Sequence, residues 1–295
     1  MPTDSRVAPE TAFAALGNEL RVAVLRVLGE FEDAGDGRGL SFTEIYDRVD
    51  IDSTSQLSYH LEKLDGVFLR SSPDGYVLTQ AGDRVVRAVR SGAYTERPSF
   101  PRTALEGHCP ACPSTTLVAV YHDPLLEVRC ADCETTVVTY DLPPAEAADR
   151  TPMEILRSCD QRVRQEYATA LQGTCATCGG RTDVSTEHRE GADGHLYVAA
   201  CRRCRHRVYA PVEVRLLYHP AVVSFYWDHG VDASAIPFWD LVRYLDDWHL
   251  ERVATDPDRF HATVACGIDR LRLAIDDDLD VSVRGDDEDA DTPAV

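Results

Sequence analysis

The hydrophobic positions of the first 64 residues recur at helical spacing and divide into three segments. The pattern predicts helices over residues 12–28, 41–49 and 53–64. Ser41-Phe-Thr-Glu44 is a capping box that opens the second helix, and Ser53 supplies a similar start signal for the third. The glycine-rich sequence AGDGRG, residues 34–39, ends the first helix.

The residues that follow predict a hairpin and one more helix. Residues 67–70 and 76–78 flank the turn Ser72-Pro-Asp-Gly75, which favours a two-stranded hairpin. Thr79 then caps a helix over 81–90. Helix, helix-turn-helix, hairpin and helix in this order predict a winged helix-turn-helix DNA-binding domain over residues 9–95.

The pattern changes again beyond residue 96, where two prolines mark residues 96–108 as a linker. A long amphipathic helix is expected over 152–171. Later, two aromatic-rich helices are expected over 221–227 and 238–249. Alternating stretches then predict a small antiparallel sheet, with strands near 251–256, 261–266, 269–275 and 279–284.

Eight of the ten cysteines form four Cys-x-x-Cys pairs, and the pairs form two sets. The two pairs are separated by 17 residues in the first set and by 22 in the second, and corresponding pairs are offset by 66 and 71 positions. We interpret the sets as one ribbon fold used twice, the second with a five-residue hairpin insertion. Each set supplies four thiolates for a tetrahedral Zn²⁺, so two zinc ions per chain are expected. The predicted ligands are Cys109, Cys112, Cys130 and Cys133, and then Cys175, Cys178, Cys201 and Cys204.

Four thiolates leave no open coordination position, which favours a structural zinc over a catalytic or sensed one. Cys159 and Cys266 have no near cysteine in the sequence. We interpret them as small buried hydrophobic residues, with a redox role as the alternative.

The expected fold class is therefore α+β and multidomain. A winged helix-turn-helix, two four-cysteine zinc ribbons and a small C-terminal α+β domain make up the chain. After residues 9–95, the expected parts are ribbon one at 105–141, a connecting helix at 144–171, ribbon two at 173–211, the C-terminal domain at 212–284 and a disordered acidic tail at 285–295.

The composition indicates the habitat of the protein and does not identify a binding partner. The formal net charge is −20, with 32 Asp against 18 Glu and 29 Arg against one Lys. Such a surface resembles proteins of salt-accumulating archaea, and in about 1 M salt the Debye length is only ~3 Å. Global charge therefore excludes no nucleic-acid partner. No long apolar run or signal peptide occurs, and the metal-type cysteine spacing fits a reducing cytoplasm.

Three segments of the N-terminal region carry a family resemblance. NELRVAVLRVL, Leu57-Ser-Tyr-His-Leu61 and Gly75-Tyr-Val-Leu-Thr79 are similar to the ArsR-like winged helix-turn-helix regulators of haloarchaea. The resemblance covers about 80 residues and continues more weakly through both ribbons. It implies a transcription regulator that binds double-stranded DNA.

The recognition helix of such a fold presents its N-terminal turns to the major groove. Burial of Leu57, Leu61 and Leu64 turns six polar residues outward, and Arg70 lies on the wing. The candidate DNA contacts are Thr54, Ser55, Gln56, Ser58, Tyr59, Lys63 and Arg70. The alternative is an ordinary solvated helix face, and His60 is expected to pack beside the core. Residues 53–97 hold six basic and five acidic side chains, a net charge of +1.

The second ribbon ends in Cys201-Arg-Arg-Cys-Arg-His-Arg207, the most basic seven residues of the chain. This knuckle can clamp a nucleic-acid backbone or neutralise an acidic neighbouring surface, and the sequence leaves both open. Residues 53–65 lack Cys, and residues 79–91 lack Cys and His, so metal sensing in the winged domain is not supported.

Three functions remain in competition. We expect a sequence-specific DNA-binding regulator that is not an enzyme. The alternatives are a general initiation factor that contacts RNA polymerase, and a zinc-dependent or redox-active enzyme. A homodimer is expected because one recognition helix reads few base pairs; Phe13, Leu16 and Phe225-Tyr-Trp227 are its candidate contacts.

Overall fold

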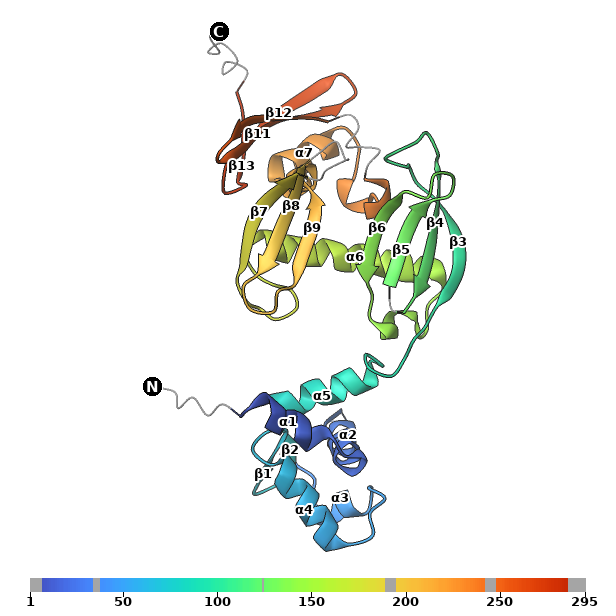
Figure 1. The fold of residues 1–295 in the computed structure, drawn as a ribbon, viewed down its shortest axis with the longest axis vertical. Coiled ribbons are helices and arrows are strands. Elements are labelled where there is room, and N and C mark those ends of the chain that lie inside the picture. The colour runs from blue at the N-terminus through green and yellow to red at the C-terminus, as the bar shows by residue number, and fades with distance from the viewer. Residues whose placement is uncertain (1–6, 34–37, 124, 189–194, 242–247, 286–295) are drawn as a thin grey trace. The chain divides into compact units, whose positions relative to one another are not determined.

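The computed structural model describes residues 7–33, 38–123, 125–188, 195–241 and 248–285. It contains two compact units (Figure 1): the first comprises residues up to 97 with 143–145, and the second comprises 98–142 and 146 onward. The expected acidic tail, beyond Gly285, and most of the glycine-rich loop lie outside the described residues. Within the described part of the chain, every helix is too short or too polar to cross a membrane.

The first unit is helical with one hairpin. Its elements are α1 Pro9–Leu16, α2 Glu19–Asp33, α3 Phe42–Tyr46, α4 Thr54–Leu64, β1 Leu69–Ser72, β2 Gly75–Leu78 and α5 Gln80–Arg90. The predicted caps are present: Ser41 forms a full capping box with Glu44, and Ser53 and Thr79 each accept a backbone N–H bond. The expected helices and hairpin after residue 40 are thus confirmed.

The prediction of one helix over 12–28 is wrong. Gly17 ends α1, and Asn18 opens a new helix by accepting a hydrogen bond from the Arg21 N–H through its side chain at 3.3 Å. Glycine and asparagine both favour such a break, because glycine adds no side-chain contacts to a helix and asparagine caps one.

The core of the first unit joins its helices to the hairpin. Val24, Leu25 and Leu28 of α2 pack with the buried leucines of α4. Leu40 pairs with Tyr76 as a short bridge beside the hairpin. Gly75 has φ of 117°, and a Cβ there would lie 2.5 Å from the Leu40 carbonyl oxygen, so only glycine fits. This contact fixes the hairpin against the helices.

The second unit contains two related sheets joined by a long helix. The first sheet is antiparallel in the order β3 Phe100–Glu106, β4 Thr116–His122, β5 Leu125–Cys130, β6 Thr136–Asp141. The helix α6, Pro152–Leu171, begins with a Thr151 capping box and follows the short turn η1 at Pro144–Ala147. The second sheet is β7 Thr182–His188, β8 His195–Cys201, β9 Arg207–Pro211.

Strand β3 corrects the expectation of a linker over 96–108. It pairs with β4 from Phe100 to Glu106, with a bulge between Phe100 and Thr103. Pro101 lies in that bulge, and β3 is an edge strand. A proline has no N–H for the ladder, so a bulge on an edge strand is where a sheet tolerates it.

The C-terminal part packs against both sheets. Its helices and turns are η2 Val212–Tyr218, α7 Pro220–Asp228, η3 Ala233–Ala235 and η4 Phe238–Asp240. The four strands β10 His249–Thr255, β11 Asp258–Cys266, β12 Asp269–Ile275 and β13 Val281–Val283 form an antiparallel sheet in sequence order. The predicted sheet and the helix at 221–227 are confirmed.

The helix predicted over 238–249 is wrong at both described ends. Residues 238–240 form only a short turn, and His249 opens β10 opposite Thr263; residues 242–247 lie outside the described part. Phe238, Trp239 and Leu241 are buried in the core of the first sheet. Their aromatic spacing resembled a helix, but their burial is satisfied by an irregular segment.

Two cores divide the second unit. One joins the first sheet, the N-terminal half of α6 and residues 236–241. The other joins β8, the C-terminal end of α6, η2, α7 and the C-terminal sheet. Helix α6 therefore contributes to both cores and holds the two cysteine-bearing sheets at its two ends.

Candidate metal centres and nucleic-acid interface

The first four cysteines converge from two knuckles of the first sheet. Cys109 and Cys112 lie between β3 and β4, while Cys130 is the last residue of β5 and Cys133 lies between β5 and β6. Sγ of Cys109 is 3.5 Å from Sγ of Cys133, and Sγ of Cys112 is 3.6 Å from Sγ of Cys130. All four sulfur atoms lie within 4.8 Å of one another.

The second four cysteines repeat this arrangement. Cys175 and Cys178 precede β7, while Cys201 is the last residue of β8 and Cys204 lies between β8 and β9. The Cys175–Cys204 and Cys178–Cys201 Sγ separations are 3.6 Å and 3.5 Å, again with all four sulfurs within 4.8 Å. Most of the extra length of this set falls between β7 and β8, at residues 189–194, which lie outside the described part.

The donor sets fit metal ions. Four sulfurs at 2.3 Å from one Zn²⁺ in a tetrahedron lie about 3.8 Å apart, close to the observed separations. The same separations exceed the ~2.0 Å of a disulfide, and all ten cysteines are free. Each cluster can therefore hold one metal ion, and its soft thiolate ligands suit Zn²⁺.

Backbone N–H groups prepare one sulfur of each cluster for a metal. The N–H groups of Cys133 and Asp132 donate to Cys130 Sγ and lower the pKa of Cys130 to about 6. In the second cluster, the N–H groups of Cys204 and Arg203 lower the pKa of Cys201 to about 6. A thiolate is the metal-binding form, so the fold itself favours ligation at these positions.

Three of the four knuckles turn through a left-handed residue directly after the second cysteine. These residues are Glu134 with φ of 59°, Gly179 with φ of 71° and Arg205 with φ of 64°. A non-glycine residue in this region costs about 1–2 kcal/mol. The knuckles at Cys133 and Cys204 therefore retain a strained side chain at the same relative position.

The two clusters differ in what surrounds them. Cys109 and Cys130 belong to the core that also buries Trp239. His108 is fixed to the neighbouring Asp240, whose carboxylate accepts the backbone N–H of His108 at 3.0 Å and lies 2.8 Å from its Nδ1. The first cluster is thus built into a hydrophobic core, and the segment 236–241 secures it.

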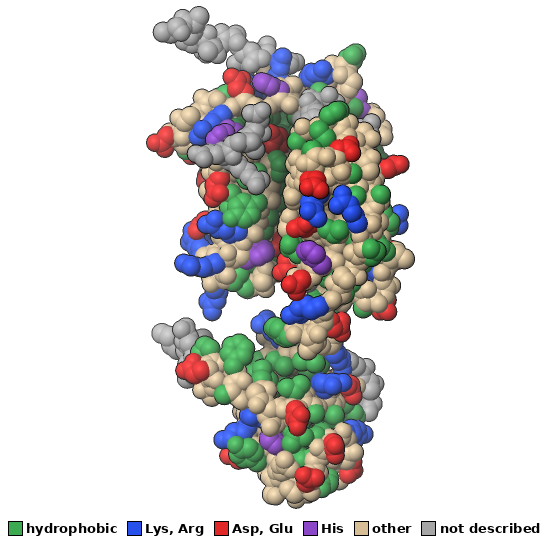
Figure 2. Space-filling model, turned by 45° about the vertical axis from the view of Figure 1, so that its right-hand side comes forward, with side chains coloured by type: hydrophobic (Ala, Val, Ile, Leu, Met, Phe, Trp, Pro, Cys, Tyr) green, Lys and Arg blue, Asp and Glu red, His purple; other side chains and the backbone are tan. Residues whose placement is uncertain are grey.

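The second cluster is surrounded by arginines. Residues 172–182 and 201–207 carry five arginines and no acidic residue, whereas the corresponding residues 106–116 and 130–136 carry three acidic residues and no Lys or Arg. Figure 2 shows blue side chains gathered over the second ribbon. The five arginines are Arg181, Arg202, Arg203, Arg205 and Arg207, and all are exposed.

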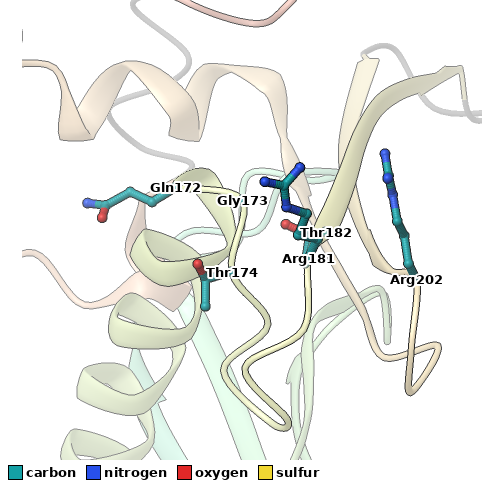
Figure 3. Close-up of a pocket in the computed structure, with 6 residues that line it drawn as sticks. All are labelled: Gln172, Gly173, Thr174, Arg181, Thr182 and Arg202. Atoms are coloured by element: carbon teal, nitrogen blue, oxygen red, sulfur yellow. The ribbon is translucent and has the colours of Figure 1, made fainter. Parts of the chain in front are cut away.

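A shallow pocket of about 410 Å³ lies beside this knuckle. Gln172, Gly173 and Thr174 line one side, and Arg181, Thr182 and Arg202 line the other (Figure 3). The side chains of Arg181 and Arg202 extend in the same direction. Sequence reasoning did not identify Arg181; the available signal was its position directly before β7, three residues after Cys178.

A hydrogen-bonded carboxylate links the two ribbons. Glu166 of α6 accepts a hydrogen bond from the Tyr140 hydroxyl at 2.8 Å, and its other oxygen contacts His206 Nε2. Tyr140 belongs to β6, and His206 follows Cys204 in the second ribbon. This contact was not predicted, because it joins residues 26 and 40 positions apart.

In the first unit, α4 separates its two faces as expected. Leu57, His60, Leu61 and Leu64 are buried, which confirms the predicted packing of His60. Burial lowers the pKa of His60, aided by the charge of Arg21. Gln56 is half-buried at the helix start, and the remaining predicted contacts are exposed: Thr54, Ser55, Ser58, Tyr59 and Lys63 on α4 and Arg70 on β1.

Two of these side chains are arranged together. Lys63 Nζ lies 5.3 Å from the centre of the Tyr59 ring, within cation–π range. By contrast, Arg87 of α5 is paired with Asp83 at 2.9 Å, so a local acid already neutralises it.

The candidate dimer contacts have different environments. The side chain of Phe13 is 74% exposed and Leu16 is half-buried. In the C-terminal stretch, Tyr226 is buried, Phe225 is half-buried and Trp227 is 68% exposed. Of the two unpaired cysteines, Cys159 is fully buried as expected, and this burial raises the pKa of its thiol to about 12; Cys266 is partly buried.

Comparisons with known proteins identify two domain families. Residues 106–281 match the model described as Domain of unknown function (DUF7351). Residues 9–89 match the model described as Domain of unknown function (DUF7347). Searches of curated proteins and of solved structures each found no match to the chain.

Proposed function

The chain belongs to the DUF7351 family, and we propose that it is a sequence-specific regulator of transcription that binds double-stranded DNA. The exposed polar face of α4 carries this proposal. Its inner face is fully committed to the core, while its outer face offers amide, hydroxyl and ammonium groups in consecutive turns. These are the groups that read base edges and phosphates in a major groove.

The proposed fold of the first unit is a winged helix-turn-helix. Helix α3 and helix α4 would form the helix-turn-helix, and the β1–β2 hairpin would be the wing that carries Arg70. The resemblance to ArsR-like haloarchaeal regulators supports this assignment. In this arrangement Gln56 pairs with a base, Lys63 contacts guanine or a phosphate, and Arg70 contacts a phosphate or the minor groove.

The proposed cofactor is Zn²⁺, two ions per chain, each held by four thiolates. A coordinatively complete site has no position for substrate, so we assign the ions a structural role and the protein no catalytic one. In such a role, zinc would add to the stability of each ribbon. Free cysteines in such sites fit the reducing conditions of a cytoplasm.

Selection of bound duplexes from a random DNA pool tests the function directly. We expect the wild type to enrich one sequence motif. The Gln56→Ala variant should discriminate less between bases at one position of that motif, with a loss of about 1–3 kcal/mol in binding free energy at that position. Lys63→Ala should weaken binding to all sequences and reduce the salt slope by about one unit if Lys63 holds a phosphate. No enriched motif, or wild-type behaviour in both variants, would refute the assignment of α4.

We also propose a homodimer, because paired half-sites give the specificity that one helix lacks. Phe13 on α1, whose side chain is 74% exposed, is the proposed contact. Light scattering at micromolar concentration in molar KCl should give twice the 32.7 kDa chain mass. The Phe13→Asp variant should give the mass of a single chain in the same measurement. A wild type that is monomeric under these conditions would refute the proposal.

A further inference from the structure

We propose that the arginine surface of the second ribbon binds the phosphodiester backbone of double-stranded DNA. This surface, called the arginine knuckle below, consists of Arg181, Arg202, Arg203 and Arg205. It is a contact region separate from α4, and it reads no base. The inference rests on the proposed function, because it assumes that DNA is the ligand of the chain.

The first argument is the charge difference between two equivalent knuckles. Arg203 and Arg205 occupy the positions that Asp132 and Glu134 occupy in the first ribbon, counted from the cysteines. A metal-binding knuckle therefore tolerates acidic side chains at these positions, and zinc ligation does not explain the arginines. In a chain of net charge −20, two segments with five arginines and no acidic residue indicate an anionic ligand.

The second argument is the lack of acidic neighbours from elsewhere. Arg181, Arg203 and Arg205 form no ion pair within the described part of the chain. Arg202 pairs with Asp183 of the adjacent strand, with Nε–Oδ1 of 2.8 Å, and so retains little charge. Arg207 likewise lies 3.9 Å from Glu187 of β7, so acidic residues of the same ribbon pair with two of the five arginines, and three guanidinium groups remain available.

The third argument is proximity. The backbone N–H of Arg202 donates to the Arg181 carbonyl at 3.0 Å, which joins the two knuckles of the cluster. A Cβ on Gly180 would lie 3.2 Å from the Cβ of Arg203. Arg181 and Arg202 line the pocket in Figure 3, where Thr174 and Thr182 add hydroxyl groups, and Arg203 follows Arg202 directly in the same knuckle.

The chemistry of this surface favours a duplex backbone. A guanidinium group matches phosphate oxygens with two parallel N–H donors. The metal-bound knuckles hold the arginine backbones rigidly, which lowers the entropic cost of binding. Single-stranded nucleic acids instead require aromatic stacking surfaces. Residues 172–182 and 201–207 contain no Phe, Tyr or Trp, and His206 is already bonded to Glu166.

The test measures binding of the full zinc-loaded chain to a 30-base-pair duplex of random sequence across a KCl series. Arg203→Gln combined with Arg205→Gln should lower the affinity about tenfold or more and reduce the salt slope by about two units, one for each lost phosphate contact. The metal content must remain at the wild-type level in this variant, which separates lost contacts from a lost fold.

The matched control is Arg102→Gln combined with Arg157→Gln. Arg102 lies on β3 and Arg157 lies in α6, and both are exposed and without an ion pair among the described residues. Arg157 lies about 21 Å along the helix from Leu171, at the end beside the arginine knuckle. The control removes the same charge from the same unit and should leave the slope unchanged. An equal loss in both variants would overturn the inference, since it would show a general charge effect.

A photo-crosslinking side chain supplies a readout that does not depend on charge. Placed at position 203 it should crosslink to the duplex, and placed at the equivalent position 132 it should not. Absence of a crosslink at 203 would overturn the inference. Displacement of the duplex by poly-glutamate at equal concentration would also overturn it, because it would indicate an acidic peptide as the ligand.

Failure of this inference can be told apart from failure of the proposed function. Loss of sequence preference in Gln56→Ala, together with unchanged binding in the arginine variant, would overturn only the role of the arginine knuckle. Loss of random-duplex binding in the arginine variant, with no effect of Gln56→Ala on any selected sequence, would support the arginine knuckle and overturn the assignment of α4.

Discussion

In the first ribbon the cysteines lie against a hydrophobic core, whereas in the second they lie beside exposed arginines. Both clusters use the same knuckle geometry, with matched N–H···S bonds to Cys130 and Cys201 and left-handed residues at Glu134 and Arg205. The chemistry that holds a metal is therefore constant, and only the surroundings vary. This comparison separates what the metal requires from what each ribbon does with its surface.

The largest effect is expected from loss of one ligand in each cluster. Cys130→Ser and Cys201→Ser should each lower the metal content by about one equivalent, because structural zinc contributes an apparent 10–16 kcal/mol to such folds. Loss at Cys130 should expose the amides of β3 to β6 in hydrogen exchange, and loss at Cys201 those of β7 to β9. The first unit should stay folded in both.

Cys266→Ser is the matched control, since Cys266 belongs to neither cluster. It should retain the wild-type metal content. If both cluster variants also retained it, the eight cysteines would not be the ligands.

The next effect concerns the core beside the first cluster. Trp239 is 4% exposed and packs with Cys109 and Cys130 in one core. Trp239→Ala should reduce the free energy of unfolding of the second unit by about 3–5 kcal/mol, as for other large buried aromatic residues. Denaturant unfolding measures this change.

The control is Trp227→Ala, at a position 68% exposed, which should change stability by less than about 0.5 kcal/mol. Equal effects of the two substitutions would show that segment 236–241 does not support the first cluster.

A charge exchange tests whether surface alone distinguishes the ribbons. Asp132→Arg combined with Glu134→Arg gives the first knuckle the charges of the second. We expect affinity for a random duplex to rise about tenfold and the salt slope to increase by up to two units. Anisotropy titrations in a KCl series measure both. Unchanged binding would mean that the arginines act only together with the pocket at Thr174 and Thr182.

The smallest effect is expected at the left-handed positions. Glu134→Gly and Arg205→Gly relieve a strained φ, and each should raise stability by up to about 1 kcal/mol after the entropy cost of glycine is included. Thermal unfolding checks this, with Thr135→Gly as a control that should destabilise. Only Arg205→Gly should also weaken DNA binding; a matching loss in Glu134→Gly would contradict the assigned difference.

The elements marked by local signals were predicted correctly. Ser53 marks the start of α4 and Thr79 marks the start of α5. The cysteine spacing locates both clusters, because caps and knuckles depend on neighbouring residues. One error, the single helix over 12–28, overlooked the local signals of Gly17 and Asn18. The other errors fall where distant contacts decide. Pro101 concealed β3, which needs β4 as its partner. Trp239 and its neighbours resembled a helix, but the core of the first ribbon holds them in an irregular turn.

The candidate functional residues divide in the same way, into those that local sequence patterns predict and those that only the fold brings together. The outer face of α4 follows from helical spacing and the burial of three leucines. The grouping of Arg181 with Arg202 does not, because a backbone hydrogen bond between two separate knuckles creates it. No spacing rule relates Tyr140, Glu166 and His206, which meet only when both ribbons have folded onto α6.

That meeting at Glu166 makes the two metal equilibria interdependent. Metal binding at the first site would order β6 and Tyr140, and metal binding at the second would order His206, so each event would prepare the carboxylate that the other ribbon contacts. The coupling would be reciprocal: either ion would strengthen the binding of the other by the same factor. Each cysteine variant would then keep its remaining ion but bind it less tightly than the wild type does.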